Sequence, residues 1–239
     1  MKVVEQSAEL LNITHHPLFL IERCGRVCYK SEDRLECESC GGSGEVVYGH
    51  DLECKAPCPD CLERAGRFVR MIIDRGHESV LEHANATFLF VTDRGISHEI
   101  VRHRLCAYSQ ESTRYCNYGN KDGEISVIRP VLEAKDESTD LWANNKDDQW
   151  RQDMYAAEKS YLDLIKRGES PQWARSVLPT CLKTEIVVTA NFRQWRHMLK
   201  LRAINKKAHP QIRQLFRMAL DKLHNHVPVV FDDVCAAFE

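Results

Sequence analysis

Hydrophobic positions recur every three or four residues in several stretches of the chain, which is the period of a helix with one buried face. Between residues 62 and 76, for example, Phe68, Met71 and Ile72 share one face, and the pattern stops at Gly76. The same pattern, with Pro and Gly near its ends, predicts helices over residues 16–29, 62–76, 96–104, 141–167, 194–203 and 211–224, and a short helix that starts at Pro171.

Short runs rich in β-branched and aromatic residues lie between these helices and predict strands. The clearest run, Ala-Asn-Ala-Thr-Phe-Leu-Phe-Val over residues 84–91, is followed by a polar turn. Further strands are predicted over residues 1–6, 125–128 and 185–190. Residues 105–118 are polar and aromatic without a helical period, which favours an extended segment that faces a ligand. We therefore expect an α/β fold of the α+β kind, with more helix than strand.

The composition is that of an ordinary folded domain, since 43% of the 239 residues are hydrophobic and 28% are charged. Its apolar runs fall short of the roughly 18 residues that span a bilayer, and its first residues lack the core of a secretory signal. We therefore expect a cytoplasmic protein, outside the membrane, with one domain over residues 1–239. A net charge of −2 does not favour a broad nucleic-acid-binding surface, but it allows a local cationic pocket.

Residues 35–61 depart from this pattern, because they contain several Gly and Cys residues, few large aliphatic side chains and no helical period. We interpret them as an insert between two helices. The pairs Cys37-x2-Cys40 and Cys58-x2-Cys61 are separated by 17 residues, a spacing typical of a four-thiolate zinc site. Because the cytoplasm keeps thiols reduced, metal binding is favoured over disulfides, with a thiol-rich disordered loop or a redox pair as alternatives.

The triplet Arg102-His103-Arg104 is the first candidate for chemistry outside the insert. Three consecutive side chains cannot share one face of a helix or strand, so they must point toward different neighbours. Such a cluster suits a site that holds phosphate and a polar ring edge together. Taken alone, the triplet is more often a solvated basic helix end.

A second candidate is Arg202, near the end of the helix predicted over residues 194–203. In that helix Trp195, Met198, Leu199 and Arg202 fall on one mostly apolar face, so the guanidinium occupies a core position. A buried guanidinium requires a polar or anionic partner. A structural carboxylate and a bound ligand both meet that requirement.

The residues that surround the triplet indicate a particular family, which the triplet alone does not. Arg102-His103-Arg104, seven further residues, Ser112 and then Arg114-Tyr115 resemble the signature motif of flavin-dependent thymidylate synthases. Three more segments resemble elements of that family in the same order: residues 76–83 (Gly-His-Glu-Ser-Val-Leu-Glu-His), residues 174–179 (Ala-Arg-Ser-Val-Leu-Pro) and residues 191–202 (Asn-Phe-Arg-Gln-Trp-Arg-His-Met-Leu-Lys-Leu-Arg). The resemblance covers about residues 62–225.

This resemblance implies a central mixed or antiparallel sheet with helices, in a homotetramer whose active sites lie between subunits. It implies that FAD is contacted by Ser79, Arg102, His103, Arg104, Gln110, Asn191, Arg193 and His197. It implies that dUMP or the folate is contacted by His77, Glu99, Arg102, Gln110, Glu111, Ser112, Thr113, Arg114, Arg175 and Arg202. Arg202 is the implied catalytic residue, at the uracil edge. Ser112 is implied to bind rather than attack, and no residue near it is clearly its base.

The implied reaction is the reductive methylation of dUMP to dTMP. Methylenetetrahydrofolate supplies the carbon, NADPH reduces FAD, and the reduced flavin delivers hydride to the pyrimidine. One alternative is an enzyme with the same pocket that makes another 5-substituted deoxyuridylate, such as 5-hydroxymethyl-dUMP. Another is a zinc-ribbon binding protein whose synthase-like body is inactive, although Arg102, Ser112, Arg114 and Arg202 are all present.

The chain departs from the family pattern at several places, among them the segment after Arg202, residues 203–210, which is one residue longer than usual and basic. Gln110 stands where some members have Glu, and Glu99 stands where some have Gln. The cysteine insert is not a usual element of the family; its Cys-Gly-Gly-Ser-Gly run resembles the zinc modules of DnaJ-type chaperones. His50 and Cys54 are further candidate ligands, so the predicted set of Cys37, Cys40, Cys58 and Cys61 is not unique. We expect a structural role for this zinc, because the segment is too polar to fold unaided, with a surface for a nucleic acid or a protein partner as the alternative.

Overall fold

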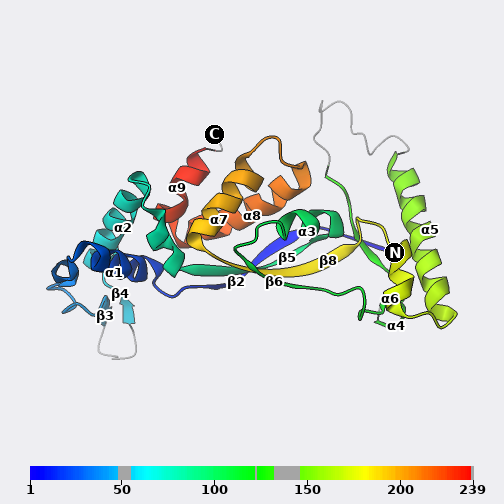
Figure 1. The fold of residues 1–239 in the computed structure, drawn as a ribbon, viewed down its shortest axis with the longest axis horizontal. Coiled ribbons are helices and arrows are strands. Elements are labelled where there is room, and N and C mark those ends of the chain that lie inside the picture. Colours follow the sequence, from blue (N-terminus) through cyan, green and yellow to red (C-terminus); the bar gives the residue numbers. More distant parts are fainter. Residues whose placement is uncertain (48–54, 122, 132–145, 238–239) are drawn as a thin grey trace.

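A four-stranded antiparallel sheet runs through the middle of the molecule (Figure 1). The computed structural model describes residues 1–47, 55–121, 123–131 and 146–237. In spatial order the strands are β2 (Ser7–Ile13), β5 (Asn85–Asp93), β8 (Lys183–Asn191) and β6 (Ala107–Gln110). Strands β5 and β8 pair along their whole length, so they form the centre of the sheet. The prediction of mixed helix and strand around an antiparallel sheet is confirmed.

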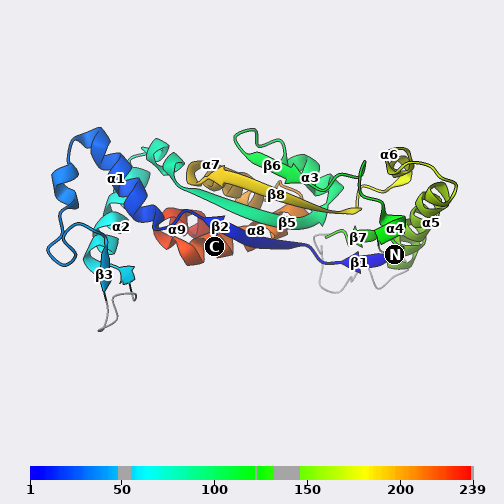
Figure 2. The ribbon, with the colours of Figure 1, turned by 90° about the horizontal axis from the view of Figure 1, so that it is seen from below.

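The main core lies between this sheet and three helices, α7 (Phe192–Leu199), α8 (Pro210–His226) and α9 (Pro228–Ala236). Figure 2 shows α7 and α8 behind the strands. Alternate residues of β5 point toward them: Phe88 and Phe90 are fully buried, and their ring centroids are 5.6 Å apart. The indole of Trp195 packs 4.9 Å from Phe88, and its Nε1 donates to the carbonyl of Ala86. Burial of each such ring contributes roughly 1.5–3 kcal/mol to stability.

A smaller core lies at the end that carries the N-terminus. Strand β1 (Lys2–Val4) pairs in parallel with β7 (Ser126–Ile128). Three helices surround that pair: α4 (Tyr118–Lys121), α5 (Lys146–Lys166) and α6 (Pro171–Ala174), which a 3-10 turn continues over Arg175–Val177. Tyr118 and Tyr161 pack together inside, and both are buried. This end therefore supports the segment that leads from β6 to α4.

The opposite end is built from α1 (Pro17–Tyr29) and α2 (Pro59–Asp74). Between them lie a 3-10 helix (Glu32–Leu35) and the strands β3 (Glu45–Val47) and β4 (Lys55–Pro57), and after α2 a second 3-10 helix covers Glu78–His83. Helix α1 approaches α2 closely at Gly25, where an added Cβ would lie 2.5 Å from ring atoms of Phe68. Glycine at this position therefore sets the distance between the two helices.

Several predicted elements differ from the structure. The helix predicted over 96–104 is α3, Arg94–Ile100, which begins because the Asp93 side chain accepts a hydrogen bond from the Ile96 amide at 2.7 Å. The predicted extended segment contains the short strand β6 and ends in α4. Strand β2 and helix α9 lie in stretches for which no element was predicted. Residues 141–145 of the long predicted helix lie outside the described part. No described helix is both long and apolar enough to cross a membrane.

Candidate active site

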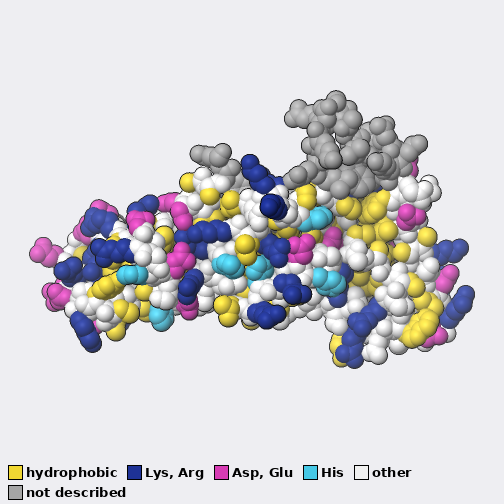
Figure 3. Space-filling view, turned by 45° about the horizontal axis from the view of Figure 1, so that its top comes forward, with side chains coloured by type: hydrophobic (Ala, Val, Ile, Leu, Met, Phe, Trp, Pro, Cys, Tyr) yellow, Lys and Arg dark blue, Asp and Glu magenta, His cyan; other side chains and the backbone are white. Residues whose placement is uncertain are grey.

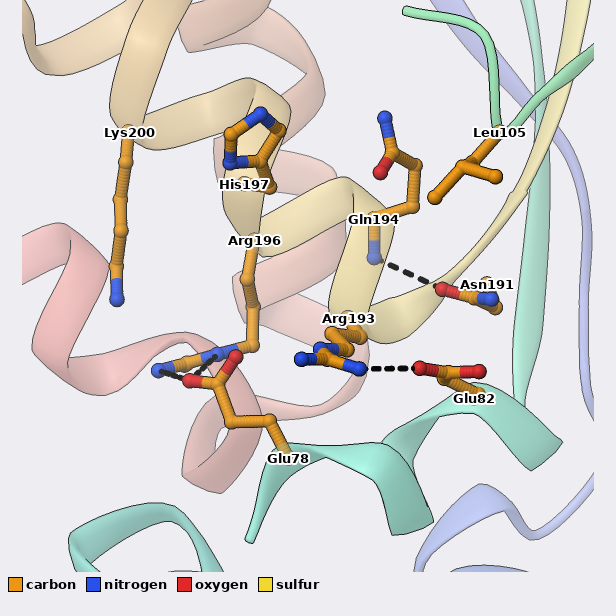
Figure 4. A pocket seen from close by; sticks show the side chains of 9 residues that line it. All are labelled: Glu78, Glu82, Leu105, Asn191, Arg193, Gln194, Arg196, His197 and Lys200. Carbon is orange, nitrogen blue, oxygen red and sulfur yellow. Dashed lines mark hydrogen bonds and ion pairs between the residues drawn. The ribbon is translucent and has the colours of Figure 1, made fainter. Parts of the chain in front are cut away.

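A groove of about 670 Å³ lies between the start of α7 and the 3-10 helix Glu78–His83 (Figure 4). Strand β8 delivers Asn191 to its edge, and the Asn191 side chain caps α7 by accepting from the Gln194 amide at 2.8 Å. The described residues that line the groove are Glu78, Glu82, Leu105, Asn191, Arg193, Gln194, Arg196, His197 and Lys200. Asn191, Arg193 and His197 were predicted to contact FAD.

Two arginines of α7 pair with glutamates across this groove. Arg193 donates to Glu82 at 2.6 Å, and both side chains are about half exposed. Arg196, only 1% exposed, donates to Glu78 at 3.0 Å and to Asp233 of α9 at 2.6 Å. The groove is thus closed on one side by a buried ion pair and lined on the other by a solvated one.

Helix α7 presents the two faces that the sequence predicted. Arg193 and His197 are exposed one turn apart, whereas Trp195, Met198 and Leu199 are fully buried. After Leu199 the chain continues as a π-helix over Lys200–Ile204. Such widened turns are frequent at functional sites.

The π-helix carries Arg202, whose guanidinium is held by two of the other predicted site residues. Its Nη1 donates to Glu99 Oε2 at 2.6 Å, and its Nε donates to His103 Nε2 at 3.1 Å. The side chain of Arg202 is 21% exposed, so it is partly buried rather than a core residue. Of the two partners that the sequence allowed, a carboxylate is therefore present in the chain itself.

His103 is a neutral imidazole in this setting. Burial, together with the charge of Arg202 and the neighbouring His197, lowers the pKa of His103 to about 4. The rings of His103 and His197 are 6.2 Å apart, which connects the Arg202 cluster to the groove. Because arginine can only donate, His103 Nε2 must accept, and its ring proton is on Nδ1.

The side chains of the Arg-His-Arg triplet point in different directions, as predicted. His103 is buried, while Arg102 and Arg104 are exposed on either side of it, in the turn that follows α3. Tyr108 of β6 secures this turn by donating to the carbonyls of Ile100 and His103, at 2.9 and 2.6 Å. Figure 3 shows Lys, Arg and His side chains close together over the middle of the molecule. Exposed guanidiniums of this kind are chemically suited to phosphate.

Gln110 is the last residue of β6 and Glu111 directly follows it, and both side chains have protein partners. The Gln110 amide donates to the hydroxyls of Ser97 and Thr184, at 2.8 and 3.2 Å. The Glu111 carboxylate accepts from the Tyr118 hydroxyl at 2.7 Å and lies 3.4 Å from Lys183 Nζ. Both side chains hold the chain that leads to Ser112.

Four other predicted ligand residues lie together near α6. The Arg175 guanidinium donates to the buried Thr113 hydroxyl at 3.4 Å. The Ser112 hydroxyl accepts from the Arg114 amide at 3.3 Å, and Arg114 Nε donates to Gln172 at 3.0 Å. Arg114 and Arg175 are exposed. This group resembles a phosphate-binding site, with two cations and two hydroxyls.

The predicted residues His77 and Ser79 are exposed at the start of the 3-10 helix Glu78–His83. His77 Nδ1 lies 2.7 Å from the Tyr29 hydroxyl of α1, and the two rings are stacked. Neither His77 nor the Thr113–Arg175 group is among the described residues that line the groove on α7, although His77 directly precedes Glu78 of that lining.

The four predicted zinc ligands converge. The Sγ atoms of Cys37, Cys40, Cys58 and Cys61 all lie within 4.8 Å of one another, with 3.8 Å from Cys37 to Cys58 and 3.5 Å from Cys40 to Cys61. Four thiolates bound at 2.3 Å in a tetrahedron stand about 3.8 Å apart, so this arrangement fits zinc. The Gly44 amide also donates to Cys40 Sγ at 3.3 Å, as expected around a metal thiolate.

The second cysteine pair lies partly in a helix. Helix α2 begins at Pro59 instead of Leu62, so Cys58 precedes it and Cys61 belongs to its first turn. His50 and Cys54, the further candidate ligands, lie outside the described residues.

Comparison with known proteins identifies the family. A family model described as "Thymidylate synthase complementing protein" matches residues 9–229. Proteins named flavin-dependent thymidylate synthase are 33% identical, over 231 residues in Mycolicibacterium vanbaalenii and over 223 in Mycobacterium tuberculosis; each match covers 90% of this chain and 78% of the relative. The chain belongs to the flavin-dependent thymidylate synthase family.

A solved structure agrees with this family fold. A UMP/dUMP methylase, PolB, from Streptomyces cacaoi, bound with 5-Br dUMP, superposes with a TM-score of 0.72. The match covers 99% of this chain and 97% of that one at 20% identity, so it supports the fold alone.

The sequence did not predict Arg196 as a residue of the α7 groove. Its partners, Glu78 and Asp233, lie 118 and 37 residues away along the chain, so no local spacing could have indicated the cluster. Lys200, which lies 3.6 Å from Asp233, was overlooked for the same reason.

Proposed function

We propose that the chain catalyses the reductive methylation of dUMP to dTMP, with methylenetetrahydrofolate as carbon donor and NADPH as the reductant of bound FAD. Family membership supports the reaction class. The observation that carries the proposal is the Glu99–Arg202–His103 cluster, which meets the α7 groove through His197. A guanidinium fixed from two sides is suited to hold and polarise a pyrimidine.

Arg202 retains donors for a substrate. Of its five N–H groups, Nε donates to His103, one on Nη1 donates to Glu99 Oε2, and one on Nη2 reaches the Glu99 carbonyl at 3.4 Å. Two N–H groups thus have no acceptor in the described part of the chain. We assign them to the uracil edge, where the positive charge stabilises negative charge that develops on the ring.

FAD, when bound, supplies the hydride chemistry. The α7 groove suits it, because Asn191, Arg193 and His197 present an amide, a cation and an imidazole along one wall. Ser79 is exposed on the 3-10 helix Glu78–His83, next to Glu78 of the groove, and is assigned to FAD as well. In this proposal the exposed arginines of the triplet bind phosphate, and the neutral His103 orients Arg202.

The phosphate of dUMP is assigned to Ser112, Thr113, Arg114 and Arg175. Two exposed arginines supply charge, and two hydroxyls supply further hydrogen bonds. Gln110 and Glu111 contribute to dUMP binding by holding the segment that carries Ser112 in place.

The folate is assigned to the neighbourhood of His77. Because neither His77 nor the Thr113–Arg175 group is among the described residues that line the α7 groove, we propose that a homotetramer brings these groups together between subunits. Light scattering of the purified protein tests this assembly, and a monomer that is fully active would contradict it.

Product analysis tests the reaction. Purified protein with dUMP, methylenetetrahydrofolate and NADPH should yield dTMP, and its absorbance spectrum should show bound flavin. Arg202→Ala should lower kcat by about 10² or more, since a transition-state hydrogen bond to charge is typically of that size. The exposed Arg167→Ala serves as the matched control. Recovery of 5-hydroxymethyl-dUMP in place of dTMP would support the alternative hypothesis, an enzyme that makes another 5-substituted deoxyuridylate.

We also propose a structural zinc ion on Cys37, Cys40, Cys58 and Cys61, in the reducing cytoplasm. Elemental analysis under reducing conditions should find one zinc per chain in the wild type. Cys61→Ser should reduce that amount sharply, whereas Cys28→Ser, outside the cluster, should leave it unchanged. A zinc-free wild-type protein would refute the site.

A further inference from the structure

A second groove, of about 690 Å³, lies between α1 and α2 at the end of the molecule opposite the N-terminus. Its lining includes five arginines, Arg26, Arg34, Arg64, Arg67 and Arg75, and the rings of Tyr29 and Phe68. No Asp or Glu is among the described lining residues. Its volume falls in the range of roughly 300–1,000 Å³ that small-molecule pockets occupy.

Two of the arginines are fixed in place by one buried carboxylate. Glu22 of α1 is fully buried and accepts from Arg26 at 2.9 Å and from Arg64 at 3.1 Å. The Arg26 guanidinium also lies 4.6 Å above the ring of Phe68. These two cations are therefore held in the groove before any ligand arrives.

The groove has an excess of positive charge. Arg67 pairs with Glu63, and both side chains are about 70% exposed, so that pair is weak and readily exchanged. Arg34 and Arg75 have no carboxylate partner among the described residues. Among the described residues, these five guanidiniums form ion pairs with two carboxylates, Glu22 and Glu63, which is an excess of three positive charges.

One end of the groove reaches the proposed folate site. Tyr29 lines the groove, and its hydroxyl lies 2.7 Å from His77 Nδ1. Arg75 precedes His77 by two residues, and Gly76 between them turns the chain at a φ of 72°. A ligand with its ring beside His77 can therefore extend its far end along the arginines.

We infer that this groove binds the carboxylate-bearing tail of the folate co-substrate, and that it selects folates that carry several γ-linked glutamyl units. The inference rests on the proposed function, because that function places the pterin beside His77. Arginine forks match carboxylates in geometry and charge, and the exposed ring of Tyr29 offers a surface to the aromatic part of the tail. The cysteine module supports the groove, since Cys58 and Cys61 start the helix that carries Arg64 and Arg67.

Equilibrium titration of the FAD-loaded protein tests the inference. The probes are folic acid with one glutamate and the same compound with four. The wild type should bind the tetraglutamate at least about tenfold more tightly, and salt should reduce the difference. In Arg34→Ala/Arg75→Ala the difference should largely vanish, because two unpaired cations are removed without disturbing Glu22. Arg167→Ala is the matched control and should retain it.

Each outcome decides one proposal. Equal affinity of the wild type for both folates overturns the tail site, and so does a double variant that keeps the full difference. If the double variant loses only NADPH-dependent flavin reduction, the tail site is also overturned, and the groove is then a binding site for NADPH. Turnover of dUMP by the wild type with monoglutamyl co-substrate tests the proposed function separately. If that turnover is absent while the tetraglutamate still binds more tightly, the groove stands and the proposed function fails.

Discussion

Arg193 and Arg196 offer a controlled comparison of a solvated and a buried ion pair. Both lie on α7, and each donates to a glutamate of the 3-10 helix Glu78–His83 (Figure 4). They differ in exposure, which is 52% for Arg193 and 1% for Arg196. Replacing each arginine by methionine removes the guanidinium and keeps an unbranched apolar stem.

For Arg196→Met we expect the free energy of unfolding to fall by about 3 kcal/mol. Removal of one partner from a buried pair typically costs about 3–5 kcal/mol. The lower end applies because Glu78 and Asp233 retain 26% and 47% exposure and can regain water. The carbonyl of Val230 also loses its donor. For Arg193→Met the loss should be at most about 1 kcal/mol, as for other exposed pairs.

Urea unfolding followed by circular dichroism measures both values, at one protein concentration because assembly shifts apparent stability. Equal losses in the two variants would refute the reasoning from burial, and so would an Arg196→Met variant as stable as the wild type. Flavin titration of the same proteins provides a second comparison. Arg193→Met should weaken FAD binding directly, since Arg193 lines the groove with its charge exposed.

Three further predictions concern the supporting structure. Gly25→Ala should cost about 1–3 kcal/mol in thermal or urea unfolding, because its methyl group would overlap the ring of Phe68; a neutral effect would show that α1 and α2 can separate freely. Asp93→Ala should cost about 2–4 kcal/mol, since it removes the α3 cap and leaves the buried Gln211 amide without its acceptor, and Asp93→Asn should recover part of that loss. Because the pKa of His103 is lowered to about 4 in the folded protein, the unfolded chain binds more protons between pH 4 and 6.5, and the free energy of unfolding should fall as the pH falls through that window. In His103→Asn the free energy of unfolding should depend less steeply on pH, and an unchanged dependence would contradict the assignment.

The elements and the site residues differ in how far local sequence could predict them. Strand β5 follows from its run of β-branched and aromatic residues, and the two faces of α7 follow from hydrophobic period, because each element places an apolar face against the core. The cysteine cluster follows from spacing, because two Cys-x2-Cys pairs can close on one metal wherever the intervening chain runs. Strand β2 was not predicted, since much of it is exposed and it has little alternation to detect.

Sequence by itself thus determined the family, the fold class, the cysteine cluster and the set of residues available for chemistry. Only the tertiary structure decided which of those residues meet. Glu99 and Arg202 are 103 residues apart, and Arg196 and Asp233 come from different helices. Contacts of this kind depend on how the sheet and helices pack, and the hydrophobic periodicity of a single segment does not indicate that packing. The arginine groove also depends on tertiary structure. Its residues lie on α1, on α2, in the segment between them and directly after α2, and the packing of α1 against α2, with Gly25 against Phe68, brings them to one surface.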